Sequence, residues 1–166
     1  MSTHSRRQFI ARSATVAAFP YVLTQRGLAA KKPASERIRV GMVGAAGRAG
    51  SLNSIFARNP NAEVVFIAEI DPRRTGQTLQ RVTEIQGHKP RVTTDFRKLI
   101  EDDSIDALCV GTPDHWHAIP TILGCLAGKD VYVEKPDGHN IVEGQRMVAA
   151  MRKHKRIVQM GSQHRS

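Results

Sequence analysis

A short glycine-rich stretch, residues 39–50, constrains the fold of this chain more than any other part of the sequence. It reads RVGMVGAAGRAG, and Ile38–Val43 has the residues of a strand. From Ser51 onward, apolar residues recur at the spacing of a helix. A strand, a tight turn and a helix form the phosphate-binding corner of dinucleotide folds, where the helix N-terminus directs N–H groups at a pyrophosphate. Gly44 has no Cβ and suits the tight turn.

The glycine pattern departs from the usual dinucleotide fingerprint at one position. The fingerprint G-x-G-x-x-G/A is met by Gly44 and Ala49, but Ala46 places a methyl group where a second glycine is expected. Gly47 and Gly50 are additional glycines. On this stretch alone, an ordinary tight turn remains an alternative to a nucleotide site.

The rest of the chain alternates between strand-like and helix-like segments. Strands are predicted at residues 38–43, 62–70, 91–94, 105–111, 129–134 and 157–160, and helices at 51–59, 72–86, 95–100, from 112–114 onward, and 140–154. Thr112 or Asp114 is expected to cap one helix, and Asn140 with Glu143 to form a capping box on another. The alternation predicts an α/β, Rossmann-type doubly wound parallel sheet with helices on both faces.

An acidic residue ends the second predicted strand. Glu69 follows the first glycine of the turn by 25 positions, where this fold holds the adenosine ribose. A carboxylate accepts hydrogen bonds from the ribose hydroxyls and repels a 2′-phosphate, so Glu69 favours NAD over NADP. Arg73 and Arg74 follow directly and act in the opposite direction. The alternative is that Glu69 is a solvated acid at a strand end.

The net charge and the cysteines point away from two other classes of protein. The formal charge is +10, but four of the 25 basic residues lie in residues 1–30, and aromatic residues make up only 5%. Without a stripe of basic and aromatic residues, we expect no nucleic-acid partner. Cys109 and Cys125 have neither zinc-site nor C-x-x-C spacing, so both are predicted to be buried hydrophobes, with a disulfide as the alternative. His115 and His117 do not share a helix face, and we expect no metal site.

The first thirty residues resemble a bacterial twin-arginine export signal. Residues 5–10 read SRRQFI, a mildly apolar stretch follows at residues 14–23, and small residues follow at Ala29 and Ala30. This resemblance predicts a signal peptide at residues 1–30, a linker at 31–37, and export by the twin-arginine machinery to the periplasm or another extracytoplasmic location. The alternative is a basic arm.

Two later motifs make the likeness to a known family specific. Residues 110–117 read VGTPDHWH and residues 128–136 read GKDVYVEKP. With the further stretches TDFR at 94–97, IDA at 105–107 and GSQHRS at 161–166, the chain resembles the Gfo/Idh/MocA oxidoreductase family over residues 38–166. Members of this family bind NAD or NADP and transfer hydride to or from sugars, polyols or related carbonyl compounds.

The resemblance implies a set of cofactor-binding positions in this chain. The set is Gly44, Ala46, Gly47, Arg48, Glu69, Thr112, Pro113, His117, Glu134 and Lys135. The glycine-rich turn would cradle the pyrophosphate, Glu69 would hold the adenosine ribose, and Thr112, Pro113 and His117 would form the wall beyond the fourth strand. Glu134 and Lys135 would lie beside the nicotinamide, with Lys135 as the catalytic lysine that binds the substrate hydroxyl.

The family also has a second domain, which we expect to be absent here. That domain is built on a large open sheet and supplies most of the substrate pocket, a D-x-x-x-H element and the usual oligomer interface. No such element follows Lys135. Two hypotheses therefore remain: an oxidoreductase of this family, or a truncated cofactor-binding module without turnover, with a homo-oligomer only where the second domain is present.

Overall fold

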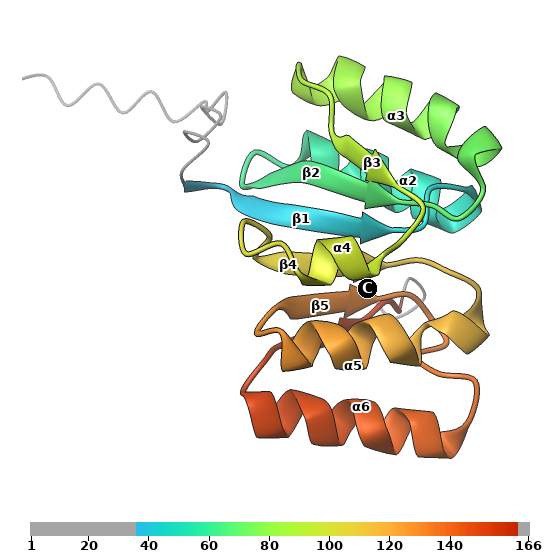
Figure 1. Ribbon diagram of the computed structural model, residues 1–166, viewed down its shortest axis with the longest axis vertical. Helices are drawn as coiled ribbons and strands as arrows, with labels where there is room; N and C mark the ends of the chain where they lie inside the picture. The colour runs from blue at the N-terminus through green and yellow to red at the C-terminus, as the bar shows by residue number, and fades with distance from the viewer. Residues whose placement is uncertain (1–35, 163–166) are drawn as a thin grey trace, which may run out of the picture. The chain divides into compact units, whose positions relative to one another are not determined.

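Six parallel strands form a single sheet in the computed structural model, which describes residues 36–162 (Figure 1). The strands are β1 (Ile38–Val43), β2 (Ala62–Ala68), β3 (Arg91–Thr93), β4 (Ala107–Val110), β5 (Asp130–Val133) and β6 (Val158–Met160). Their order across the sheet is β3-β2-β1-β4-β5-β6, and every neighbouring pair is parallel. The predicted export signal lies outside the described residues.

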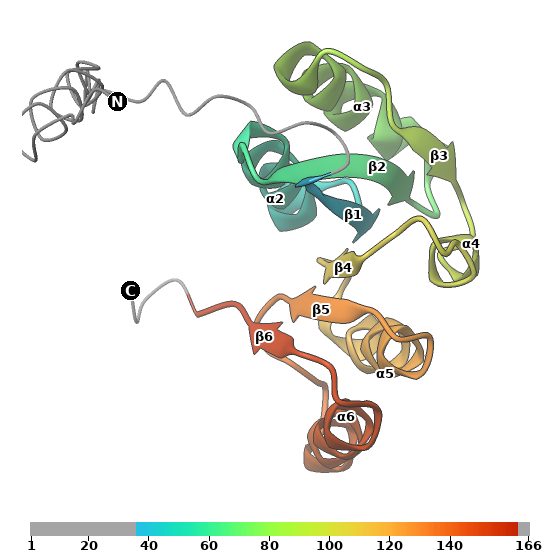
Figure 2. The same cartoon turned by 90° about the vertical axis from the view of Figure 1, so that its left-hand side faces the viewer.

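Helices cover both faces of the sheet, so the predicted fold class is confirmed. The helices are α2 (Gly47–Arg58), α3 (Pro72–Gln86), α4 (Arg97–Ile100), the 3₁₀ turn η3 (Asp114–Trp116), α5 (Ala118–Leu126) and α6 (Ile141–His154). Figure 2 shows α2 and α3 on one face and α4, α5 and α6 on the other. The chain reverses its direction of winding between β1 and β4, and such a switch point leaves a crevice at the carboxyl ends of the strands.

Two apolar cores lie on the two faces of the sheet. One contains Met42 and Ile67 beneath α2 and α3, and the other contains Leu108 and Val133 beneath α4, α5 and α6. Both patterns follow from strands that are buried on both faces and therefore read as continuous apolar runs. None of the helices within residues 36–162 is both long enough and apolar enough to cross a bilayer.

The two cysteines are buried, as predicted, and no disulfide joins them. Cys109 belongs to the core under α2 and α3, whereas Cys125 belongs to the core on the opposite face. Burial raises the pKa of both thiols above the ordinary cysteine value.

Several helix starts differ from the sequence prediction. Helix α2 begins at Gly47 rather than Ser51, because the small residues after the turn form the first helical turn instead of extending the loop. The predicted caps at Thr112 and Asp114 are wrong, since neither η3 nor α5 has a side-chain cap hydrogen bond. An apolar pattern marks the buried face of a helix and carries no information about its first turn.

The predicted cap of α6 is confirmed. Asn140 Oδ1 accepts a hydrogen bond from Glu143 N at 3.0 Å. Glu143 Oε2 accepts from His139 N at 2.7 Å, one residue before the position used in a standard capping box. The side chains of Asn140 and Glu143 therefore fix the end of the β5–α6 connection to the first turn of α6.

Candidate functional site

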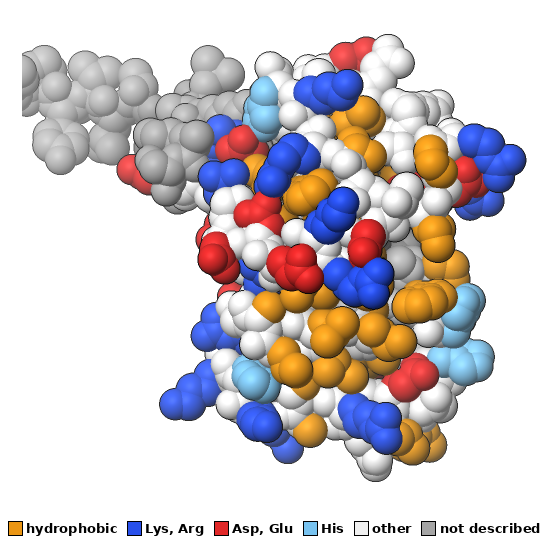
Figure 3. Space-filling view, viewed as in Figure 1, with side chains coloured by type: hydrophobic (Ala, Val, Ile, Leu, Met, Phe, Trp, Pro, Cys, Tyr) orange, Lys and Arg blue, Asp and Glu red, His pale blue; other side chains and the backbone are white. Residues whose placement is uncertain are grey.

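A cavity of about 1160 Å³ lies at the carboxyl ends of the strands, at the switch point between β1 and β4. The turn after β1, the ends of β2 and β4, and residues of η3 and α5 line it. On the face shown in Figure 3, charged side chains gather over α4 and hydrophobic ones over α5. Gly44, Ala46 and Gly47 line the cavity on the β1 side, and Ile119, Pro120 and Leu123 line it on the α5 side.

Buried side chains hold the backbone of the turn after β1. Asn53 Nδ2 donates hydrogen bonds to the carbonyl oxygens of Gly44 and Ala49, at 3.1 and 2.8 Å. Thr78 Oγ1 donates to the carbonyl oxygen of Ala45 at 2.6 Å. The sequence did not predict a role for Asn53 or Thr78 at the site. The only feature that could have indicated one is that each is a polar residue at a buried position of a helix.

Gly44 itself is required by both conformation and space. Its φ is +107°, in the left-handed region, and a Cβ there would lie 3.1 Å from the carbonyl oxygen of Gly111. Gly111 is equally crowded, because its Cβ would lie 2.9 Å from the Cβ of Ala49. The turn after β1 and the end of β4 thus meet through glycine and alanine at their closest approach.

The first turn of α2 opens into the cavity. Ala46, Gly47 and Arg48 line it, and α2 has neither a side-chain cap nor an acidic residue in its first turn. The first N–H groups of a helix have no partner within the helix, and its dipole places partial positive charge there. Such an end of a helix of 12 residues, without a side-chain cap, is suited to a pyrophosphate.

Glu69 lies at the end of β2, next to this turn, as predicted. Its Oε2 accepts a hydrogen bond from Ala45 N at 2.9 Å, and its Oε1 accepts from Asp71 N at 3.1 Å. The carboxylate therefore has a fixed orientation at the edge of the cavity that Glu69 lines. A carboxylate accepts up to about four hydrogen bonds, so both oxygens retain capacity for a ligand hydroxyl.

Asp71 binds the two arginines that follow Glu69. Its oxygens accept from Arg73 Nε and Nη2, each at 2.9 Å, and one lies 3.5 Å from Arg74 Nε. The hydrogen bonds from Arg73 lower the pKa of Asp71. Arg74 also lines the cavity. The positive charge next to Glu69 is thus partly neutralised by Asp71.

The opposite wall of the cavity follows β4. Thr112 and Pro113 line it as predicted, and Trp116 and Phe96 extend it with an edge-to-face ring pair whose centroids are 6.4 Å apart. Trp116 remains 45% exposed. The two rings were not predicted as site residues, because they come from separate loops that only the fold brings together.

His117 is buried behind this wall rather than lining it, which corrects the expected wall of Thr112, Pro113 and His117. Its Nε2 lies 2.7 Å from the carbonyl oxygen of Thr112, and its Nδ1 contacts the carbonyl oxygen of Pro136. The imidazole therefore joins the segment after β4 to the segment after β5. His117 therefore positions the cavity wall through its contacts with these two backbone carbonyl oxygens.

Glu134 and Lys135 follow β5 at the same edge of the sheet as Gly44 and Glu69, because all strands are parallel. Glu134 is buried, and its Oε1 accepts a hydrogen bond from Arg48 Nε at 2.7 Å. This contact raises the pKa of Arg48. Lys135 is exposed. Neither Glu134 nor Lys135 belongs to the cavity lining, so they lie beside the cavity and not within it.

Comparison with known proteins agrees with this geometry. Residues 38–162 match the family model described as "Oxidoreductase family, NAD-binding Rossmann fold". Inositol 2-dehydrogenase from Rubrobacter xylanophilus is 34% identical over 134 residues, which cover 79% of this chain and 37% of that protein.

Solved structures show the same fold. GenD2 from gentamicin A biosynthesis, in complex with NAD, has a TM-score of 0.68 at 24% identity, over 76% of this chain and 34% of that one. A mutant of KijD10, a 3-ketoreductase from Actinomadura kijaniata in complex with TDP-benzene and NADP, has a TM-score of 0.64 at 28% identity, over 75% and 38%. The chain thus spans about a third of the length of these proteins.

Proposed function

The chain belongs to the Gfo/Idh/MocA oxidoreductase family, with residues 38–162 as its NAD-binding Rossmann domain, and we propose that it serves hydride transfer to or from a sugar, polyol or related carbonyl compound. The observation that carries this proposal is the crevice at the switch point, where an uncapped helix N-terminus and the Glu69 carboxylate line one cavity. A bound nicotinamide dinucleotide supplies the hydride chemistry itself.

The residues of the cavity fit such a cofactor. The N–H groups at the start of α2 would bind the pyrophosphate, and Arg48, which lines the cavity while it contacts Glu134, would add positive charge. Thr112 Oγ1 is buried in the cavity wall without a hydrogen-bond partner in the described structure, and a ligand would supply one. Trp116 and Phe96 offer an apolar surface to a planar base.

The environment of Glu69 supports a preference for NAD over NADP. Its carboxylate is held by two backbone N–H groups at the position where the adenosine ribose would bind. The arginines that could bind a 2′-phosphate, Arg73 and Arg74, already contact Asp71. Both features disfavour the additional phosphate group of NADP.

Lys135 is proposed to act on the substrate rather than on the cofactor. Its side chain is exposed and lies outside the cavity lining, at the same sheet edge as Gly44. An ammonium group there would bind the substrate oxygen and exchange a proton with it while hydride moves. In an enzyme that contains the substrate-binding part of the family, Lys135→Ala should lower turnover much more than NAD affinity. Equal losses of both would contradict this role.

Calorimetric titration of the chain with NAD and NADP tests the proposal. We expect NAD to bind more tightly, and Glu69→Gln to weaken NAD binding about tenfold, because the ribose loses a charged acceptor. Glu84→Gln on the exposed side of α3 is the matched control and should leave both affinities unchanged. The proposal would be contradicted if neither cofactor bound, or if NADP bound more tightly than NAD.

A screen of inositols and sugars with the bound cofactor distinguishes the two functional hypotheses. Turnover by the 166-residue chain would exclude a cofactor-binding module without activity. Binding without turnover would favour that module for this chain.

We also propose that the chain is exported. The support is the SRRQFI stretch and the apolar residues after it, which resemble a twin-arginine signal. Replacing Arg6 and Arg7 by lysine should retain the protein in the cytoplasm when cell fractions are compared by immunoblot. Equal export of this variant and the parent would contradict the proposal.

A further inference from the structure

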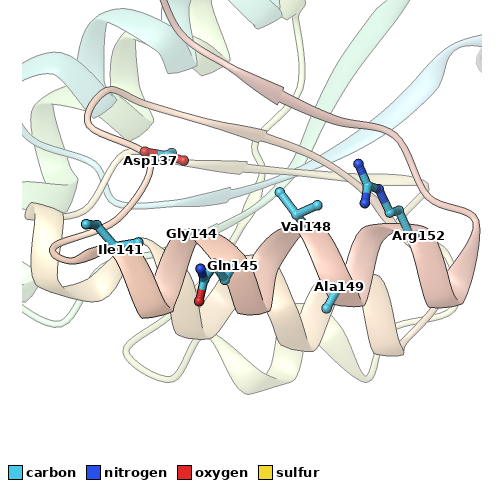
Figure 4. A pocket seen from close by; sticks show the side chains of 7 residues that line it. All are labelled: Asp137, Ile141, Gly144, Gln145, Val148, Ala149 and Arg152. Atoms are coloured by element: carbon cyan, nitrogen blue, oxygen red, sulfur yellow. The ribbon is translucent and has the colours of Figure 1, made fainter.

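Helix α6 has an outer face that no other described element covers. A shallow groove of about 470 Å³ runs along it and is lined by Asp137, Ile141, Gly144, Gln145, Val148, Ala149 and Arg152 (Figure 4). The six helical positions recur at i, i+3, i+4, i+7, i+8 and i+11, which makes one continuous stripe. The opposite side of the helix, with Met147 and Ala150, packs into the core. The groove is distinct from the cofactor cavity, because the two share no lining residue.

Apart from Gln145, the residues between the two ends of this stripe are small or apolar. Ile141 is 81% exposed and Val148 is 42% exposed, and both lie on this one face of the helix. Gly144 lies between these two residues and has almost no side chain to keep a partner away. Ala149, another small residue, directly follows Val148. Small residues at this spacing allow another helix to approach closely.

The two ends of the stripe carry opposite charges. Asp137 lies beside the first turns of α6, since a Cβ on Gly144 would be 3.7 Å from its Oδ2, and Arg152 lies at the far end (Figure 4). Eight residues separate Gly144 from Arg152, or about 12 Å along the helix axis. The groove therefore has an acidic end, an apolar centre and a basic end.

We propose that this α6 stripe docks against the same stripe of a second copy of the chain, with the two helices antiparallel. A two-fold interface requires a patch that is complementary to itself. With the axis between residues 146 and 147, Gly144 faces Ala149 of the second copy, and Gln145 faces Val148 of the second copy. Arg152 of the second copy then lies opposite Ile141, within reach of Asp137, and the pairing repeats by symmetry.

The surface also indicates how strong this association is. A single pair of short helices buries less than the roughly 1,600 Å² of a standard stable interface. We therefore expect a weak dimer in rapid exchange, whose association falls as salt screens its exposed ion pairs. This contact differs from the oligomer expected from the sequence, which depended on a second domain.

Sedimentation equilibrium of the 166-residue chain over a range of concentrations tests the proposal. The parent chain should show a concentration-dependent dimer. Asp137→Arg and Arg152→Asp should each weaken association about tenfold or more, because each places like charges opposite one another. The double variant with both changes should restore association to near the parent value, since the opposite charges face each other again.

Matched variants separate docking from a loss of helix stability. Lys153→Asp makes the same change of charge as Arg152→Asp one residue outside the stripe, with the same cost to the end of the helix. It should leave association unchanged. Val148→Lys, at an exposed position, should break the dimer without changing the melting temperature. A monomer at all concentrations, failure of the double variant to restore association, or equal effects at Lys153 and Arg152 would each overturn the proposal.

Discussion

The two halves of the sheet build the cavity in different ways. The first half, β1–β3 with α2 and α3, contributes backbone that is held by buried polar side chains such as Asn53 and Thr78. The second half, β4–β6 with α5 and α6, contributes exposed side chains such as Trp116 and Ile119. Helices α2 and α3 cover one face of the sheet and α5 and α6 cover the other, and the core on each face includes strand residues from both halves, such as Phe66 and Cys109.

The difference corresponds to what each half would bind. Phosphate and ribose are the constant parts of a dinucleotide, and a rigid backbone cradle suits a constant ligand. Under the proposed function, the second half would face the substrate, which differs among members of a family, and exposed side chains can change there without disturbing the fold. Three of the contacts between the halves can each be broken by a separate substitution.

The largest effect is expected at the closest approach of the halves. Gly111→Val would place a branched side chain against Ala49, where even a Cβ lies 2.9 Å from the Cβ of that alanine. We expect the free energy of unfolding to fall by about 3 kcal/mol and NAD binding to be lost, because the turn after β1 must move. Urea unfolding followed by calorimetry measures both.

Gly76→Ala is the matched control for that substitution. Gly76 lies within α3, and a Cβ there would meet no atom within 4 Å. The change should raise stability by up to about 1 kcal/mol, since alanine favours a helix interior. If Gly111→Val and the parent chain have the same urea concentration at the midpoint of unfolding, the two halves are packed less tightly than we infer.

An intermediate effect is expected at the ion pair that joins α2 to the end of β5. Arg48→Ala leaves the buried Glu134 carboxylate without the guanidinium at 2.7 Å. Because Arg48 is 43% exposed, solvent screens the pair, and we expect a loss of about 1–2 kcal/mol. A double-mutant cycle with Glu134→Gln should give a coupling of about 1 kcal/mol. Additive losses would mean that the two side chains act independently.

The smallest effect is expected at the amino ends of the strands. The Asp102 carboxylate accepts hydrogen bonds from Ser104 and Arg91, and Lys129 Nζ donates to the Asp102 carbonyl oxygen at 2.8 Å. The Ser104 hydrogen bond, with the Arg91 contact, lowers the pKa of Asp102 to about 2. This segment links β3 to the start of β5.

The sign of the resulting pH dependence follows from the lowered pKa. The stabilisation is fully present above the unfolded-state value of about 4 and is lost as the pH falls toward 2. Asp102→Asn should remove about 1 kcal/mol of stability at pH 7 and flatten the acid limb of unfolding curves between about pH 4 and 2. Asp103→Asn, at the exposed neighbouring position, should not. Parallel acid limbs for Asp102→Asn and the parent would exclude this contribution.

Much of the first half could be predicted from the sequence, because its evidence is local. The turn at Gly44, the buried run of β2 and Glu69 at its end all lie within a short stretch of chain. The parallel sheet with helices on both faces also followed, since strand-like and helix-like segments alternate along the chain.

The second half was predicted less well, because its site depends on contacts between distant segments. The sequence predicted Thr112 and Pro113 at the cavity, but it could not show that His117 turns inward or that Phe96 meets Trp116. Caps failed for a related reason: Thr112 and Asp114 have suitable side chains, but Asp114 lies within η3, and η3 separates Thr112 from α5. The hydrogen-bond partners of a polar side chain depend on which segments the fold brings next to it. The periodicity of the sequence does not give this information.

One imidazole ring joins two loops at the carboxyl ends of the strands. His117 contacts the carbonyl oxygens of both Thr112 and Pro136, so the loop that borders the cavity and the loop that carries Lys135 are held by the same buried side chain. Under the proposed function, exposed residues on both loops could be exchanged as the substrate preference evolves, while His117 would keep the spacing between Lys135 and the cavity.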